Sequence, residues 1–257
     1  MPGKTTLPET GNPRGLPSAM ADRLIVALDV PTLRQAADIV ATLDGTVSFF
    51  KIGLWLAFAE GIDGLLKSII GAGKKVFLDT KMYDIGKTVE EGVARAADRG
   101  VSFVTVHGDR QIMEAGVKGK RGRDIKIFAI TVLTSLDDAA LKAMGYAMTA
   151  EQLIRLRVSQ ALACGCDGVI ASAHDHPDTM RKVGGSENLL IATPGIRGAD
   201  DPVDDHRRAA DAASAIERGA DYLVVGRPII AHADPGARAR KIIAEMQQGH
   251  RRRQASA

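Results

Sequence analysis

Cysteine is scarce in this sequence, whose 257 residues include only Cys164 and Cys166. Two cysteines cannot build a disulfide framework, and alone they cannot fill a four-ligand zinc site. We interpret them as small buried thiols that lie just before a strand. A domain held together by disulfides is therefore excluded.

Long hydrophobic runs are also absent. No segment approaches the ~18 uninterrupted apolar residues that a membrane span requires. The N-terminal residues lack the apolar core of a secretory signal. These absences predict a soluble protein, most simply a cytoplasmic one, with no membrane partner.

Aromatic residues are few and the charge is nearly balanced. Aromatics make up 4% of the chain, so base-stacking platforms are not expected. Lysine and arginine outnumber the acids 34 to 31, and Arg251, Arg252 and Arg253 alone account for that excess. A basic face that follows a phosphate backbone is therefore absent, which argues against nucleic acid as a partner.

Glycine-rich nucleotide motifs are missing as well. No apolar run is followed by G-x-G-x-x-G, and the glycines at 71 and 73 precede a strand without the Ser or Thr of a phosphate loop. An open doubly wound sheet would be expected to offer such a turn, so this architecture is only the second choice.

Eight short apolar runs, by contrast, recur along the chain. They show little alternation of apolar and polar residues, which is typical of parallel strands covered on both faces. Segments with apolar residues at three- and four-residue steps, such as 32–43, 89–100 and 150–165, lie between them and indicate helices. The pattern and length predict a single-domain (β/α)₈ TIM barrel. The predicted strands span residues 24–30, 47–53, 75–81, 101–107, 125–133, 168–172, 189–195 and 222–228.

The two ends of the chain differ from this pattern. Residues 1–20 are rich in Pro, Gly and Thr without periodicity, which predicts a flexible leader. Residues 247–257 are polar and basic, which predicts a frayed tail. The barrel domain is therefore expected to span residues 21–246.

Charged residues mark the ends of the first three predicted strands. Asp29 ends the first run, Lys51 lies in the second, and Asp79 and Lys81 end the third. Asp79 and Lys81 are two residues apart, so an extended strand would point both to one side. A structural ion pair is the simplest explanation of one such pair. Recurrence at the same end of several strands instead favours a site, because burying many ionised groups is costly.

Later strand ends carry glycine beside arginine. Arg197 follows Pro194-Gly195-Ile196, and Gly226-Arg227-Pro228 follows the eighth run. Glycine lets backbone N–H groups approach an anion, and a guanidinium binds two oxygens at once. Barrels commonly place a phosphate after these two strands, so we predict a phosphate site there.

These segments resemble the orotidine 5′-phosphate decarboxylase family in its bacterial, monofunctional form. The resemblance spans residues 24–230 in the family's order. FLDTKMYDIGKTV, followed by TPGIR and GRPI, is its most specific part, whereas D-x-K-x-x-D at Asp79, Lys81 and Asp84 is shared with related phosphosugar enzymes. The carrying segments are LIVALDV, FFKIG, FLDTKMYDIGKTV, TVLTS, TPGIR and YLVVGRPI.

The resemblance implies catalytic roles for four residues. Asp79 would lie against the substrate carboxylate, and Lys81 would protonate C6 once CO₂ leaves. Lys51 would link the ribose to the charge array, and Asp84 would complete that array in the neighbouring subunit of a homodimer.

The resemblance also implies binding roles. Thr88 would reach the partner's site together with Asp84. The remaining contacts would be Asp29 to a ribose hydroxyl, Thr134 and Ser135 to the pyrimidine, and Arg197, Gly226 and Arg227 to the phosphate.

Two departures from the family pattern accompany these matches. The family usually has a glutamine after Arg197 that contacts phosphate and pyrimidine, and His206 occupies that place here. His107 is followed by GDRQIM rather than by the small residues and glycines often found there, and we assign it no catalytic role.

The expected chemistry needs no cofactor. Loss of CO₂ from C6 leaves an anion in the ring plane, and most decarboxylases use an organic cofactor or a metal as an electron sink. The sequence has no motif for pyridoxal phosphate or thiamine, so fixed charge at Lys81 is expected to stabilise the anion. No metal is expected either, because His174 and His176, two apart in a polar loop, are typically solvated.

Two other functions compete with this one. One is a metal-dependent decarboxylase or aldolase of the same barrel superfamily that acts on a sugar phosphate. The other is a catalytically silent module that senses nucleotides by binding phosphate. Lys81 argues against the second, because phosphate binding offers no reason to place a lysine between two acids.

Overall fold

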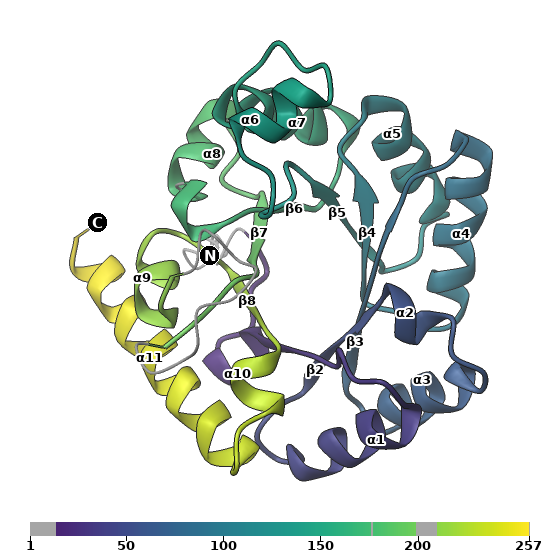
Figure 1. Ribbon diagram of the computed structural model, residues 1–257, viewed down its shortest axis with the longest axis vertical. Coiled ribbons are helices and arrows are strands. Elements are labelled where there is room, and N and C mark those ends of the chain that lie inside the picture. Colours follow the sequence, from purple (N-terminus) through teal and green to yellow (C-terminus); the bar gives the residue numbers. More distant parts are fainter. Residues whose placement is uncertain (1–13, 176, 199–209, 257) are drawn as a thin grey trace, which may run out of the picture.

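Eight parallel strands close into a barrel, with helices arranged around it (Figure 1). The strands pair in chain order, and β8 pairs with β1 to complete the ring. The predicted (β/α)₈ barrel is thus confirmed, and an open sheet is excluded. This computed structural model describes residues 14–175, 177–198 and 210–256. The strands are β1 (Leu24–Ala27), β2 (Phe49–Gly53), β3 (Lys75–Met82), β4 (Phe103–His107), β5 (Lys126–Ile130), β6 (Gly168–Ile170), β7 (Leu190–Thr193) and β8 (Tyr222–Val225).

Helices make up the outer layer, and the three expected at 32–43, 89–100 and 150–165 are confirmed as α1, α4 and α7. Among the described residues, no helix is both long and apolar enough to cross a bilayer. The short α2, α6 and α10 lie in the connections that follow β2, β5 and β8. The helices are α1 (Leu33–Thr42), α2 (Leu54–Ala57), α3 (Ile62–Gly71), α4 (Gly86–Asp98), α5 (Arg110–Gly119), α6 (Asp138–Ala143), α7 (Ala150–Cys164), α8 (Pro177–Gly184), α9 (Ala212–Glu217), α10 (Arg227–Ile230) and α11 (Pro235–Ala255), with 3₁₀ turns η1 (Met20–Arg23) and η2 (Ala173–Asp175).

Helix α7 shows how local sequence sets the ends of an element. Thr149 accepts a hydrogen bond from the backbone N–H of Gln152, whose side chain accepts one from the Thr149 N–H. This capping box satisfies two donors that would otherwise have no partner. Gly165 then ends the helix with φ +79°, a conformation that glycine adopts without a Cβ clash.

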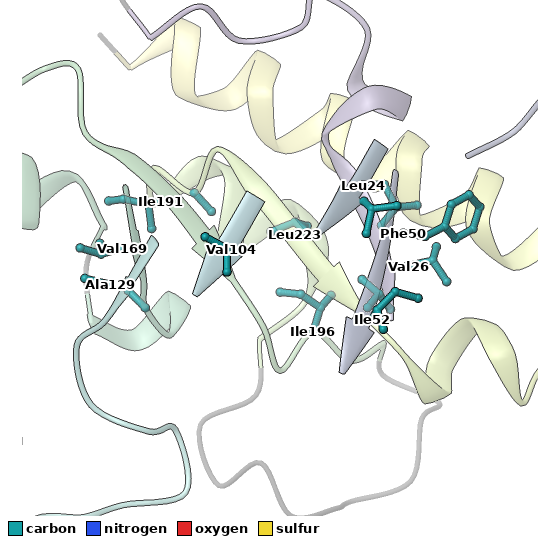
Figure 2. Packing of buried hydrophobic residues seen from close by; sticks show 14 of the residues in the cluster. Leu24, Val26, Phe50, Ile52, Val104, Ala129, Val169, Ile191, Ile196 and Leu223 are labelled. Atoms are coloured by element: carbon teal, nitrogen blue, oxygen red, sulfur yellow. The ribbon is translucent and has the colours of Figure 1, made fainter. Parts of the chain in front are cut away.

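The hydrophobic core has two layers. Between the barrel and the helices, aliphatic side chains of strands and helices form one buried cluster, and Figure 2 shows some of its strand residues, among them Val26, Val104 and Leu223. Inside the barrel, aromatic rings fill the space, and Phe49 meets Phe103 edge-to-face with ring centroids 4.8 Å apart. The interior rings are Phe49, Phe77, Phe103, Phe128 and Tyr222. Half of the few aromatic residues of the chain therefore fill the barrel interior.

Several strands are shorter than the apolar runs that predicted them. β1 ends at Ala27 rather than at residue 30, and β5 ends at Ile130 rather than at residue 133. Leu28, Thr131 and Val132 are buried although they follow the strands. Burial thus continues into the first loop residues, where the backbone leaves the sheet, so an apolar run overestimates strand length.

The last seven residues of the predicted flexible leader make tertiary contacts with the barrel. Residues 1–13 lie outside the described part of the chain, but Arg14 forms an ion pair with the fully buried Asp221 at 3.1 Å. Leu16 packs against the aromatic cluster inside the barrel, and Met20 is buried. These tertiary contacts hold residues 14–20 although the segment has no hydrophobic periodicity.

Most of the predicted frayed tail is helical in the structure, because α11 continues to Ala255. A Cβ at Gly249 would lie 2.1 Å from the Ala213 carbonyl oxygen, so the two backbones are in close contact there. Arg253 contacts Asp178 at 2.7 Å. The last turns of the helix are therefore held by a close backbone approach and by ion pairs, whereas Ala239, Ile242 and Met246 pack its earlier turns into the core.

Candidate active site

The first three strands present an alternating row of charges at their carboxyl ends. Asp29 follows β1 and lies 3.0 Å from Lys51 Nζ on β2. Lys51 Nζ is 3.6 Å from Asp79 Oδ2 on β3, and the same oxygen is 2.9 Å from Lys81 Nζ. The sequence prediction that these four side chains converge is thus supported by their geometry.

Asp79 and Lys81 do not meet by the simple alternation of an extended strand. The pairing of β3 with β4 is irregular between Leu78 and Met82, and Lys81 has φ +48°. Positive φ is uncommon for a residue with a side chain. A bulge, which redirects side chains next to active sites, therefore brings the two charges together.

Electrostatics keeps Asp79 ionised. Burial alone would raise the pKa of this carboxyl, but Lys51 and Lys81 outweigh burial and hold the pKa below its ordinary value. Close packing adds a steric condition, because a Cβ at Gly53 would lie 2.6 Å from Asp29 Oδ1. The array thus presents fixed charges, and glycine at position 53 leaves room for it.

The array lies in a cavity of about 890 Å³ at the carboxyl end of the barrel. Ile130, Val132 and Leu133 contribute apolar surface, and Thr134 is the polar residue that follows them. Of the predicted binding residues, Asp29, Lys51, Asp79, Thr134, Arg197, Gly226 and Arg227 line this cavity, as does Lys81. The charge array, an apolar wall and two arginines therefore share one space.

Among the described residues, the predicted binding residues Ser135 and Thr88 do not line this cavity. Ser135 is exposed in the connection that follows Thr134. Its contact with the pyrimidine stays a prediction. His206 lies outside the described residues.

Asp84 and Thr88 also lie apart from the array of their own chain. Both are exposed, and Asp84 Oδ1 accepts a hydrogen bond from the Ile85 N–H at 2.6 Å. Asp84 lines a separate cavity of about 500 Å³ with Tyr83 and Asp109. This placement separates Asp84, the third charged residue of the D-x-K-x-x-D motif, from the charge array of its own chain.

His107 belongs to the surroundings of that second cavity rather than to the main one. Its ring contacts that of Tyr83 at a tilt of 34° with centroids 4.3 Å apart, and its Nδ1 is 3.3 Å from Asp109 Oδ2. Burial, followed by the positive charge of Arg157, lowers the pKa of His107. The interpretation that His107 is not a catalytic residue is consistent with this position.

Three side chains near the array were not predicted from the sequence. Thr105 on β4 donates a hydrogen bond to Asp79 Oδ1 at 2.9 Å, and Trp55 and Phe58 line the mouth of the cavity. Threonine is common in buried strands, and apolar residues after a strand look like core, so no local signal distinguishes them. Within the described ranges, no three His, Cys, Asp or Glu side chains are grouped so that they could hold a metal ion.

Comparisons with known proteins agree on one family. Residues 22–242 match the model of the Orotidine 5′-phosphate decarboxylase / HUMPS family. Relatives named orotidine 5′-phosphate decarboxylase include that of Afipia carboxidovorans, 49% identical over 91% of this chain and 98% of its own, and that of Caulobacter vibrioides, 46% identical over 87% and 97%. The crystal structure of orotidine 5′-phosphate decarboxylase from Lactobacillus acidophilus superposes with a TM-score of 0.77 at 31% identity, over 88% of this chain and 99% of that one. This chain, whose cavity holds the Asp29–Lys51–Asp79–Lys81 array, therefore belongs to the orotidine 5′-phosphate decarboxylase / HUMPS family.

Proposed function

We propose that this protein decarboxylates orotidine 5′-phosphate to uridine 5′-phosphate, a step of pyrimidine biosynthesis, in the cytoplasm and without a cofactor. The observation that carries the proposal is the alternating array, which ends at Lys81 Nζ, 2.9 Å from Asp79. This chain aligns with 98% and 97% of the length of two relatives that are named for this activity.

The cavity divides into regions that match the parts of the substrate. Arg197 and Arg227, which follow β7 and β8, supply guanidinium groups for the phosphate. Asp29 and Lys51 are placed for the ribose hydroxyls. Thr134, beside the apolar wall, is placed for the pyrimidine.

Decarboxylation then follows from fixed charge. The bond from C6 to the carboxylate breaks, its electron pair stays on C6, and CO₂ leaves. The Lys81 ammonium stabilises the developing carbanion and transfers its proton to C6. Asp79, kept ionised by its two lysine neighbours, lies against the departing carboxylate and favours its loss.

We further propose a homodimer in which Asp84 and Thr88 complete the partner's site. Both residues are exposed, and apolar side chains on the neighbouring α2 and β3–α4 segments lie uncovered. Phe58 is 82% exposed and Ile85 is 79% exposed. Exposed apolar surface next to a functional cavity is typical of an interface.

Turnover of orotidine 5′-phosphate by chelator-treated protein tests the proposed activity, and the loss of orotidylate absorbance measures it. We expect full activity after chelation. Activity only on a sugar phosphate, and only with a divalent metal restored, would instead support the metal-dependent enzyme. Nucleotide binding without turnover of either substrate would support the silent module.

Arg227→Ala should raise KM for orotidine 5′-phosphate by about 100-fold or more, because a charged hydrogen-bonding partner of the phosphate is lost. Steady-state kinetics with orotidine 5′-phosphate and with a phosphate-free analogue measures the effect. The analogue should be much less affected, since binding energy from the phosphate is absent there. Equal losses on both substrates would mean that Arg227 supports the structure.

A further inference from the structure

The β3 bulge is bridged by one buried hydroxyl on the neighbouring strand. Leu78 pairs with Val104 and Met82 pairs with Val106, so Thr105 alone faces the three residues 79–81. Thr105 is fully buried. Its side chain therefore lies where the regular backbone pairing of the two strands is interrupted.

The hydrogen bonds of this hydroxyl have a defined direction. The Lys81 backbone N–H donates to Thr105 Oγ1 at 2.8 Å. The hydroxyl proton of Thr105 then donates to Asp79 Oδ1 at 2.9 Å, because an ionised carboxylate only accepts. One hydroxyl thus contacts Asp79 and Lys81, the first and last residues of the bulge.

This arrangement gives the two oxygens of the Asp79 carboxylate different partners. Oδ1 is held by Thr105, whereas Oδ2 is left for Lys81 at 2.9 Å and Lys51 at 3.6 Å. The same hydroxyl satisfies the Lys81 N–H at the residue whose φ is +48°. Both the orientation of the acid and the backbone of the lysine depend on this contact.

We propose that Thr105 is a positioning residue, which aims the Asp79 carboxylate and fixes the Lys81 backbone for decarboxylation. The expected effect of this role on the kinetics rests on the proposed function. The charged groups facing Asp79 are Lys51 from β2 and Lys81 from β3, with Asp29 beyond Lys51. Thr105 supplies the donor from β4, which stabilises the ionised form of Asp79.

Thr105→Val removes the hydroxyl at nearly constant shape and should lower kcat about 10- to 100-fold, the loss expected for a hydrogen bond to a charged group. KM should stay within about threefold, because the phosphate and pyrimidine contacts are unchanged. Thr105→Ser keeps the hydroxyl and should restore kcat to within about threefold of the parent protein. Thr80→Val is the matched control, because the buried Thr80 hydroxyl has no hydrogen-bond partner among the described residues.

The pH profile gives a readout that loss of packing would not produce. The pKa of Asp79 is depressed, so its ionised form is present above that pKa and is lost as the pH falls through it. Without the Thr105 donor this pKa should rise, and the acidic limb of kcat/KM should move to higher pH in Thr105→Val. The profiles of Thr105→Ser and Thr80→Val should match that of the parent.

A direct titration separates this inference from the proposed function. In protein labelled with ¹³C at the aspartate carboxyl carbon, the Asp79 resonance, assigned by its loss in Asp79→Asn, should titrate at higher pH in Thr105→Val. This measurement needs no turnover, so it stands even if orotidine 5′-phosphate is not the substrate. An unchanged Asp79 titration, or equal kinetic losses in Thr105→Val and Thr105→Ser, would overturn the positioning role.

Discussion

Lys81→Ala is expected to lower turnover of orotidine 5′-phosphate by about 10⁴-fold or more while the barrel stays folded. The substitution removes both the proton donor and the cation nearest to the developing carbanion, and each effect is typically worth about 10²-fold or more. Stability should change little, since the Lys81 side chain is 44% exposed. Single-turnover kinetics, with circular dichroism as a check of folding, measures the effect.

Lys67→Ala serves as the control for this change, because Lys67 is an exposed lysine on α3 that does not line the cavity. It should keep the activity of the parent protein. Turnover of Lys81→Ala within about tenfold of the parent corresponds to only ~1.4 kcal/mol in the barrier. Such a result would remove Lys81 from the role of proton donor.

Mixing two inactive proteins should restore activity if the site is shared between subunits. In the proposed dimer, Lys81→Ala and Asp84→Ala chains would form heterodimers in which one site receives both lesions and the other receives none. Random exchange at equal concentrations makes half of the dimers heterodimers, each with one intact site of two. Activity should therefore return to about a quarter of that of the parent.

The matched control for this experiment pairs Lys81→Ala with Asp79→Ala. Both residues belong to the same chain's array, 2.9 Å apart, so every heterodimer site keeps one lesion and no activity should return. Tagged subunits show whether exchange has taken place. If exchange is complete and Lys81→Ala with Asp84→Ala stays inactive, Asp84 acts within its own subunit and the shared-site model fails.

The barrel could be predicted from the sequence because its signals are local and repeated. Each strand is an apolar run, and the helices between them have their own periodicity, as 150–165 shows for α7. The charges of the array were found for the same reason, since Asp29, Lys51 and Asp79 all lie within the apolar runs, towards their carboxyl ends. Once the strands are assigned, barrel geometry alone brings those ends together.

The two ends of the chain could not be predicted in this way. Arg14 is ordered by Asp221, which is more than two hundred residues away in sequence. The end of α11 is held by the close approach of Gly249 to Ala213 and by Arg253. Contacts of this kind leave no periodic pattern in the sequence, so composition alone predicted a flexible leader and a frayed tail.

Thr105 illustrates a second limit, which concerns side-chain function. A threonine inside a strand satisfies every local preference for a sheet, so nothing marks its hydroxyl as part of a site. Its importance depends on the irregular pairing of β3 with β4, which no local pattern in the sequence marks. Ser135 shows the converse case, since its place in TVLTS favoured a binding role although it lies outside the cavity.

Trp55 has a practical consequence. It is the only tryptophan in the chain, and it lines the cavity mouth with 63% of its surface exposed. Excitation at the long-wavelength edge of the protein's ultraviolet absorption therefore selects the Trp55 indole at the entrance to the site. A ligand that enters there, or a second subunit that covers α2, would remove water from that ring and shift its emission to the blue. The protein thus contains a natural fluorescent reporter of both events, and no dye has to be attached.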